Sequence, residues 1–172
     1  MRTAVSEMLG VEFPILAFSH CRDVVAAVTN AGGFGVLGGV AHTPEQLDID
    51  LTWIEEQTKG RPYGVDLLLP QKYAGSDEGG LDRETLASLL PPAQREFLDD
   101  LLARYGVPAL PDDEHRPQGA LQIDPRGYEP LLEVAFAHRI GLFASALGAP
   151  PAPVVERSKA AGVPVAALAS SA

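Results

Sequence analysis

The sequence predicts an α/β fold in which parallel strands alternate with helices. Short apolar runs of strand length are followed by segments whose apolar residues recur with helical spacing. Parallel strands need a long, usually helical, connection between them, so this alternation favours a parallel sheet over hairpins. The 172 residues, 46% of them hydrophobic and 21% charged, supply enough apolar material for one domain with a sizeable core.

Residues 1–70 contain three of these repeats. We expect strands at residues 13–18, 34–37 and 63–69, and helices at residues 23–30 and 44–59. The run Ala31-Gly32-Gly33 ends the first helix, because glycine commonly follows a helix C-terminus. The second helix begins with Thr43-Pro44-Glu45-Gln46, in which Thr43 caps the helix, Pro44 fits its first turn and Gln46 completes a capping box.

Residues 71–127 interrupt the alternation and are expected to form an insertion of helices and loops. A polar, glycine-rich loop at residues 71–80 precedes two amphipathic helices at residues 82–90 and 93–105, and a proline-rich acidic stretch follows at residues 107–119. The second helix carries Phe97, Leu98, Leu101 and Leu102 on one side. The insertion is too small to own a core, so the chain is expected to be one domain.

The alternation resumes after the insertion. We expect helices at residues 128–138 and 151–161, and strands at residues 140–147 and 163–168. Two architectures fit such a series: an open, doubly wound sheet, or a (β/α)₈ barrel that stops after about five units, since a complete barrel takes about 250 residues. Composition alone does not choose between them.

Charge and cysteine content exclude several classes of function. The chain has 13 Lys and Arg against 23 Asp and Glu, and this acidic balance argues against nucleic-acid and anionic-membrane partners. Its single cysteine, Cys21, forms no internal disulfide, and no Cys/His cluster suggests a metal. No apolar run approaches the roughly 20 residues of a membrane span, and Glu7 and Glu12 make the N-terminus a poor signal peptide. A cytoplasmic location is therefore expected.

The glycine-rich stretch NAGGFGVLG, residues 30–38, has two interpretations. It nearly contains a dinucleotide-binding GxGxxG pattern, but its glycines lie between a helix and a strand, whereas that pattern needs them between a strand and a helix. A tight helix-to-strand turn is the better interpretation. Gly38 and Gly39 follow the second strand, where glycine either lets a flat ring approach the backbone or simply makes a flexible loop.

Two polar residues stand out beside the expected strands. Asp66 interrupts the apolar run YGVDLLL, and a buried carboxylate is costly unless it is paired. It either contacts a ligand or is satisfied by backbone amides or an arginine. His20 ends the first strand, where it either donates to a ligand or caps the next helix. His42 is expected to be a solvated loop residue.

Three segments resemble the nitronate monooxygenase family: the first strand with its small-residue turn at residues 13–20, the block NAGGFGVLG, and PYGVDLLLP at residues 62–70. The later segment IGLFASALGAPPAPVVERSKAAGVPVAAL is similar to the family's fourth and fifth strands with the helix between them. This resemblance implies a TIM barrel that binds FMN at the carboxyl ends of its strands. It also implies oxidation of alkyl nitronates with O₂.

The resemblance assigns candidate cofactor contacts to the ends of the strands. The first-strand turn of the family lies against the FMN ring, and the family often carries an asparagine where Asp66 stands. The candidate FMN-binding residues are Ala17, Phe18, Ser19, Gly38, Gly39, Asp66 and Ser170. His20 is the candidate catalytic residue, and no metal is expected.

The chain also departs from the family pattern. The family has a histidine in an AGGH-type motif, and glycine-rich phosphate loops after its seventh and eighth strands. Histidines occur here only at positions 20, 42, 115 and 138, and none follows AGG. We therefore expect a barrel truncated to about five units, without the family's catalytic histidine and phosphate loops. Its exposed sheet edge is expected either to promote self-association or to leave the chain only marginally stable, and strong flavin binding is expected to fail. The alternatives are a non-catalytic flavin- or nucleotide-binding module, and an inactive remnant that associates with a full-length relative.

Overall fold

The chain folds around one parallel sheet with the strand order β1-β2-β3-β4-β5. This computed structural model describes residues 2–73, 75–78, 80–81, 83–108 and 124–169. The strands are β1 (Leu16–Ser19), β2 (Phe34–Gly38), β3 (Gly64–Leu67), β4 (Leu142–Ser145) and β5 (Val165–Ala167). All neighbouring pairs are parallel, so the expected pairing is confirmed, although the strands are shorter than the apolar runs that predict them.

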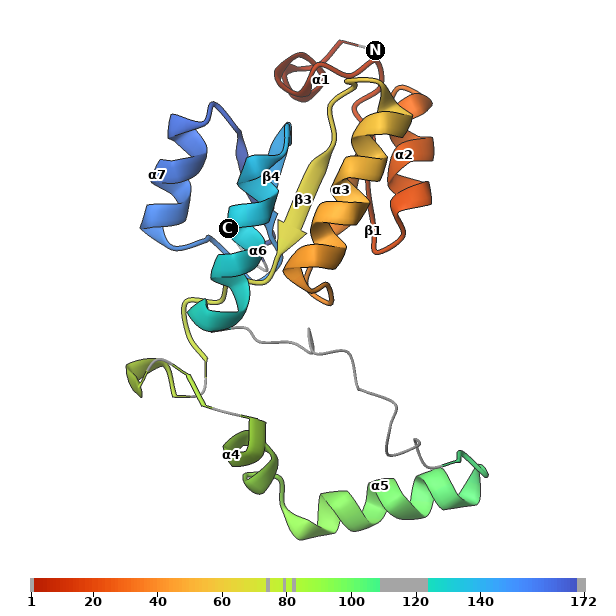
Figure 1. Cartoon of the computed structure of the whole chain (residues 1–172), viewed down its shortest axis with the longest axis vertical. Coiled ribbons are helices and arrows are strands. Elements are labelled where there is room, and N and C mark those ends of the chain that lie inside the picture. Colours follow the sequence, from red (N-terminus) through yellow and green to blue (C-terminus); the bar gives the residue numbers. More distant parts are fainter. Residues whose placement is uncertain (1, 74, 79, 82, 109–123, 170–172) are drawn as a thin grey trace.

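The helices between successive strands cover one face of the sheet (Figure 1). They are α2 (Arg22–Asn30), α3 (Pro44–Thr58), α6 (Pro125–Ala137) and α7 (Ala152–Ala160). Each contributes to one apolar cluster, which Leu37, Val65 and Phe143 join from the strands. A doubly wound sheet places helices on both faces. Helices on a single face instead make this sheet a sector of a TIM barrel, with its other face turned toward the barrel interior.

The interior face is closed at the amino ends of the strands by α1 (Ala4–Leu9), a helix that was not expected from the sequence. Leu9 packs there with Phe34, Val36 and Leu142. The Thr3 side chain caps α1 in a capping box with Ser6. The helix has only six residues, which are too few to show helical periodicity in the sequence.

Local sequence signals set the ends of the longer helices. Thr43 and Gln46 form the expected capping box of α3, and Lys59 ends that helix in a left-handed conformation (φ 53°). The helix α6 begins at Pro125, three residues before the expected start at Tyr128, because the Asp124 side chain caps it by accepting from the Gly127 amide.

The glycine-rich stretch before β2 is a packing feature, as the helix-to-strand interpretation predicts. A Cβ atom at Gly35 would collide with the backbone of Val25, so α2 crosses β2 at a distance that only glycine permits. The Thr29 hydroxyl accepts from the Gly35 amide at 3.2 Å. These contacts place Gly35 against α2 at the helix-covered face.

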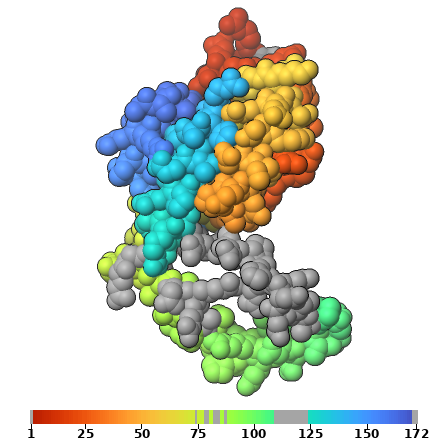
Figure 2. Space-filling view, in the orientation of Figure 1, coloured from red at the N-terminus to blue at the C-terminus, as the bar shows by residue number. Residues whose placement is uncertain are grey.

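The insertion after β3 extends away from the sheet (Figures 1 and 2). It contains η1 (Ser76–Glu78), α4 (Arg83–Ser88) and α5 (Pro92–Arg104). No residue of α5 is buried, and Phe97 is 67% exposed. The described part of the insertion thus adds no core. Among the described residues, no helix is both long and apolar enough to cross a membrane.

Candidate functional site

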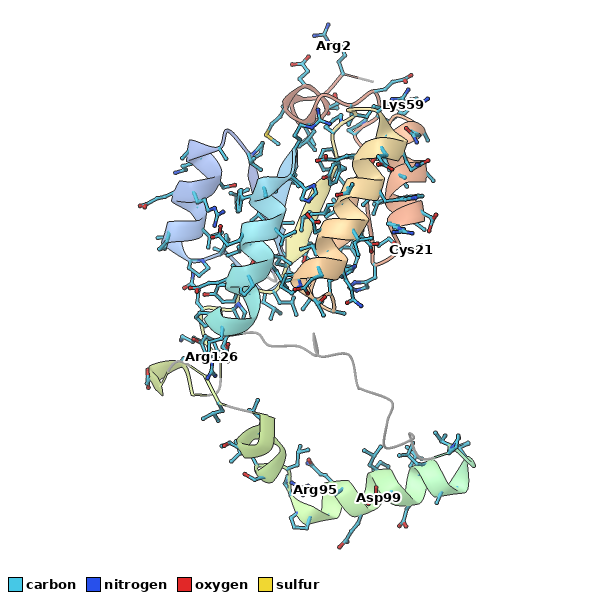
Figure 3. All side chains as sticks on the ribbon, viewed as in Figure 1. Arg2, Cys21, Lys59, Arg95, Asp99 and Arg126 are labelled. Carbon is cyan, nitrogen blue, oxygen red and sulfur yellow. The ribbon has the colours of Figure 1, made fainter. Side chains whose placement is uncertain are left out.

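The carboxyl edge of the sheet carries a row of small side chains around one carboxylate. Strand pairing aligns Gly38 with Asp66, Asp66 with Ala144, and Ala144 with Ala166. Side chains alternate between the two faces of a strand, and Leu37, Val65 and Phe143 point to the helices, so this row points to the barrel interior. In Figure 3, Cys21 marks this edge of the molecule and Lys59 the opposite one.

His20 and Phe18 lie over Gly38 at the end of β1. The His20 Nδ1 atom is 2.9 Å from the Gly38 carbonyl oxygen, and it donates because a carbonyl only accepts. The Phe18 ring meets the imidazole edge-on, with centroids 5.0 Å apart. A Cβ atom at Gly38 would lie 2.6 Å from Phe18 Cζ and 2.7 Å from His20 Nδ1. Gly38 is therefore required for the two rings to pack where they do.

Asp66 is the buried acid of this edge, with 5% of its surface exposed. Burial raises its pKa to about 6, although the nearby charge of His20 acts in the opposite direction. No described residue donates a hydrogen bond to its carboxylate. The interpretation that backbone amides or an arginine satisfy Asp66 is thus wrong for the described part of the chain.

Among the described residues, the remaining candidates lie around this centre without pointing into it. Ala17 and Ser19 alternate to the helix-covered face, where the Ser19 hydroxyl accepts from the Cys21 amide at 3.0 Å. A Cβ atom at Gly39 would lie 3.0 Å from Leu67 Cδ2, so Gly39 faces the helix layer. Ser170 lies outside the described residues. The structure therefore brings together Phe18, His20, Gly38 and Asp66. It leaves Ala17, Ser19 and Gly39 with only their backbone near the edge.

A cavity of about 840 Å³ lies beyond the ends of β3, β4 and β5. Residues of the three loops that follow these strands line it, including Gln71, Lys72, Leu147 and Leu168. The Gln71 side chain donates to the Ala149 carbonyl at 3.1 Å and so connects two of those loops. Lys72 brings a positive charge to the cavity. The sequence gives no periodic signal for this site, because it is assembled from loops that are distant in the chain.

The loop after β2 is held by an ion network that sequence reasoning missed. His42 Nε2 lies 3.0 Å from one oxygen of Asp50, and the Arg22 guanidinium lies 2.9 Å from the other. Arg22 also stacks over Trp53, 4.8 Å from the ring centre. The side chain of His42 is only 12% exposed, so the expectation of a solvated loop residue is wrong. The network fixes the loop that follows Gly38 and Gly39.

Comparison with known proteins places these features in a family. The family model described as nitronate monooxygenase matches residues 2–172. A protein of Mycobacterium tuberculosis named "Putative monooxygenase Rv1533" is 61% identical over 173 residues, which cover 100% of this chain and 46% of that protein. A "Probable nitronate monooxygenase" of Staphylococcus saprophyticus is 35% identical over 74 residues, or 41% of this chain and 21% of that protein.

Solved structures show the same fold. Nitroalkane oxidase from Streptomyces ansochromogenes superposes with a TM-score of 0.65 at 22% identity, covering 98% of this chain and 43% of that one. FabK from Thermotoga maritima superposes with a TM-score of 0.59 at 19% identity, covering 99% and 38%. These neighbours are TIM-barrel enzymes, and the chain spans less than half the length of its Mycobacterium relative. With a family model matched along nearly all of its sequence, this chain belongs to the nitronate monooxygenase family.

Proposed function

We propose that the chain supplies part of the FMN site of a nitronate monooxygenase type of oxidoreductase, which oxidises alkyl nitronates with O₂. Enzymes of this family are flavin-dependent in general. The observation that carries the proposal is Asp66, a buried carboxylate with no donor among the described residues, at the edge of the sheet where barrel enzymes bind ligands.

The residues at this edge fit a flavin. A carboxylate accepts hydrogen bonds, and a flavin offers both a ring N–H and the hydroxyls of its ribityl chain as donors. The small side chains of Ala144 and Ala166 beside Asp66 leave room for a flat ring. Bound FMN supplies the electron acceptor of the oxidation.

The chain's own residues then have separate tasks. Phe18 places an apolar ring beside the site, where it packs edge-on against the His20 imidazole. His20 has its Nδ1 atom committed to the Gly38 carbonyl, so Nε2 is the ring nitrogen left for a ligand. Lys72 gives the neighbouring cavity a positive charge, which suits an anionic substrate such as an alkyl nitronate.

Reconstitution with FMN tests the proposal. We expect the purified chain to acquire flavin absorbance and to consume oxygen when an alkyl nitronate is added. Flavin binding without oxygen consumption would favour a non-catalytic binding module, and a protein that stays colourless with added FMN would favour an inactive remnant. Asp66→Leu is expected to lose FMN, whereas Asp23→Asn, an exposed carboxylate of α2, is the matched control that keeps it.

Self-association and a cytoplasmic location complete the proposal. Within the described sheet, the edge strands β1 and β5 each have one side that pairs with no other strand, so their backbone groups on that side can pair with another strand. Exposed apolar side chains accompany both edges, among them Ile15 beside β1 and Leu168 after β5, which are 61% and 62% exposed. The cytoplasmic location is supported by Cys21 being the single cysteine of the sequence.

A further inference from the structure

The surroundings of Asp66 are unusual for an acidic side chain, because the described residues around it include almost no other polar group. The strands β2, β4 and β5 bring Gly38, Ala144 and Ala166 to its row, and none of these side chains ionises. From the residue that follows β1, His20 interacts with Asp66 electrostatically. The helices lie on the other face of the sheet, and Lys72 lines the cavity beyond the strand ends.

While no ligand is present, this arrangement keeps Asp66 protonated to a higher pH than an exposed carboxyl group would be. Burial without a hydrogen-bond donor penalises the charged form of a carboxyl group, whereas a donor placed against it favours the charged form. A ligand that brings an N–H or O–H to this carboxyl group therefore changes which form is stable. A positive charge on His20 also favours the charged form of Asp66, as a hydrogen-bond donor of the ligand does.

We infer that ligand binding at this edge is coupled to the loss of one proton from Asp66, with His20 as the counter-charge. The inference rests on the proposed function, since the ligand is taken to be a flavin. In the binding step the O–H bond of the Asp66 carboxyl group breaks and its proton passes to solvent. The carboxylate then accepts a hydrogen bond from the ligand, and no electron is transferred.

Calorimetric titration with riboflavin tests this coupling, because riboflavin lacks the phosphate whose own titration would obscure the result. Heats measured in two buffers of different ionisation enthalpy give the number of protons released. We expect release of close to one proton at about pH 5, and an affinity that falls about tenfold between about pH 7.5 and pH 5. Lumiflavin keeps the ring N–H but lacks the ribityl chain, so it shows which flavin donor Asp66 accepts from. If that donor is the ring N–H, lumiflavin binding also releases a proton.

Two variants separate this coupling from general effects on the fold. Asp66→Asn keeps the size of the side chain and an acceptor oxygen, so we expect it to bind riboflavin without proton release. His20→Gln removes the counter-charge, so the pH at which release occurs is expected to rise. Glu56→Gln, an exposed acid on α3, is the control that leaves proton release unchanged.

The possible outcomes distinguish the coupling from the flavin site itself. Riboflavin binding by the unaltered chain with no proton release, and with an affinity independent of pH, would overturn the coupling while the flavin site stands. Failure of both riboflavin and FMN to bind at any pH would overturn the flavin site and the coupling together. Proton release that persists in Asp66→Asn would assign the proton to another group and overturn the inference.

Discussion

Asp66 makes the stability of the folded chain depend on pH, apart from any ligand. Its pKa rises from an ordinary 3.8 to about 6 through burial, so the folded chain holds this proton more tightly than the unfolded chain. The resulting stabilisation is complete below about pH 4 and is lost as the pH rises through about 6, a change of up to about 3 kcal/mol. We expect Asp66→Asn to be more stable than the unaltered chain above pH 6, with urea unfolding as the measurement. If Asp66→Asn were more stable than the unaltered chain by the same free energy of unfolding at pH 4, this account would be contradicted.

Two glycines of β2, Gly35 and Gly38, are each required for a different packing contact. Alanine substitutions at the two positions are therefore expected to have different effects. A Cβ atom at Gly38 meets the movable rings of Phe18 and His20, whereas one at Gly35 meets the backbone of Val25. We expect Gly38→Ala to cost about 1–3 kcal/mol and to weaken flavin binding, because the rings must leave their places. Gly35→Ala is expected to cost more, since α2 itself must move. Denaturant unfolding combined with FMN titration checks both, and equal losses of stability would contradict the distinction.

At the scale of elements, Glu55 joins α3 to the start of β3 and the end of α6. Its carboxylate accepts from the Tyr63 hydroxyl at 3.2 Å and from the Arg139 amide at 2.8 Å. His138 lies 3.5 Å away and also reaches Asp48. Burial alone would raise the pKa of Glu55, but the Arg139 amide and the charge of His138 hold it below its ordinary value.

Removal of this carboxylate tests how much the connection contributes. We expect Glu55→Ala to lower the free energy of unfolding by about 1–3 kcal/mol, because it leaves the buried Tyr63 hydroxyl without its acceptor. Glu56→Ala changes the neighbouring exposed acid of the same helix and is expected to have little effect. Urea unfolding measures both variants. Equal stability of the two would show that the network does not hold α3 and α6 together.

The helix α5 contributes little to the stability of the sheet. All of its residues are exposed, including the apolar side chains Phe97 and Leu98. We therefore expect the double substitution Phe97→Gln and Leu98→Gln to change the free energy of unfolding by less than about 0.5 kcal/mol. Thermal unfolding checks this at low protein concentration. A larger loss would mean that the apolar side of α5 packs against another part of the molecule.

The fold was largely predictable because its signals are local. The Thr43 capping box and the apolar runs at β2 and β3 lie within a few residues of the elements that they define. By contrast, α1 was missed because six residues are too few for a periodic pattern. At the site, Asp66 could be identified from the sequence because it is a charged residue inside an apolar run. The salt bridge between Asp50 of α3 and Arg22 of α2 could not, because its two residues are far apart in the sequence and no motif connects them.

At the scale of the whole molecule, the exposed edge of β1 predicts association. Leu16 is 45% exposed on this edge strand, and Ile15 beside it is 61% exposed. We expect the chain to sediment as a dimer or larger species at micromolar concentration, and Leu16→Lys to shift it toward the monomer, because a charge on an edge strand opposes pairing. Ile49→Lys is the matched control, since Ile49 is 59% exposed on α3. A monomer at every concentration for the unaltered chain would contradict edge-mediated association.

The insertion has a consequence for the order in which the sheet assembles. The strands β3 and β4 are neighbours, yet residues 68–141 separate them along the chain. The entropy of closing so long a loop grows only logarithmically, by about 0.6 kcal/mol for each doubling of length. Distant pairings nevertheless slow folding, so we expect β1, β2 and β3 to assemble early and β4 and β5 to dock last. The insertion is therefore nearly neutral for equilibrium stability and sets the time that the chain takes to complete its sheet.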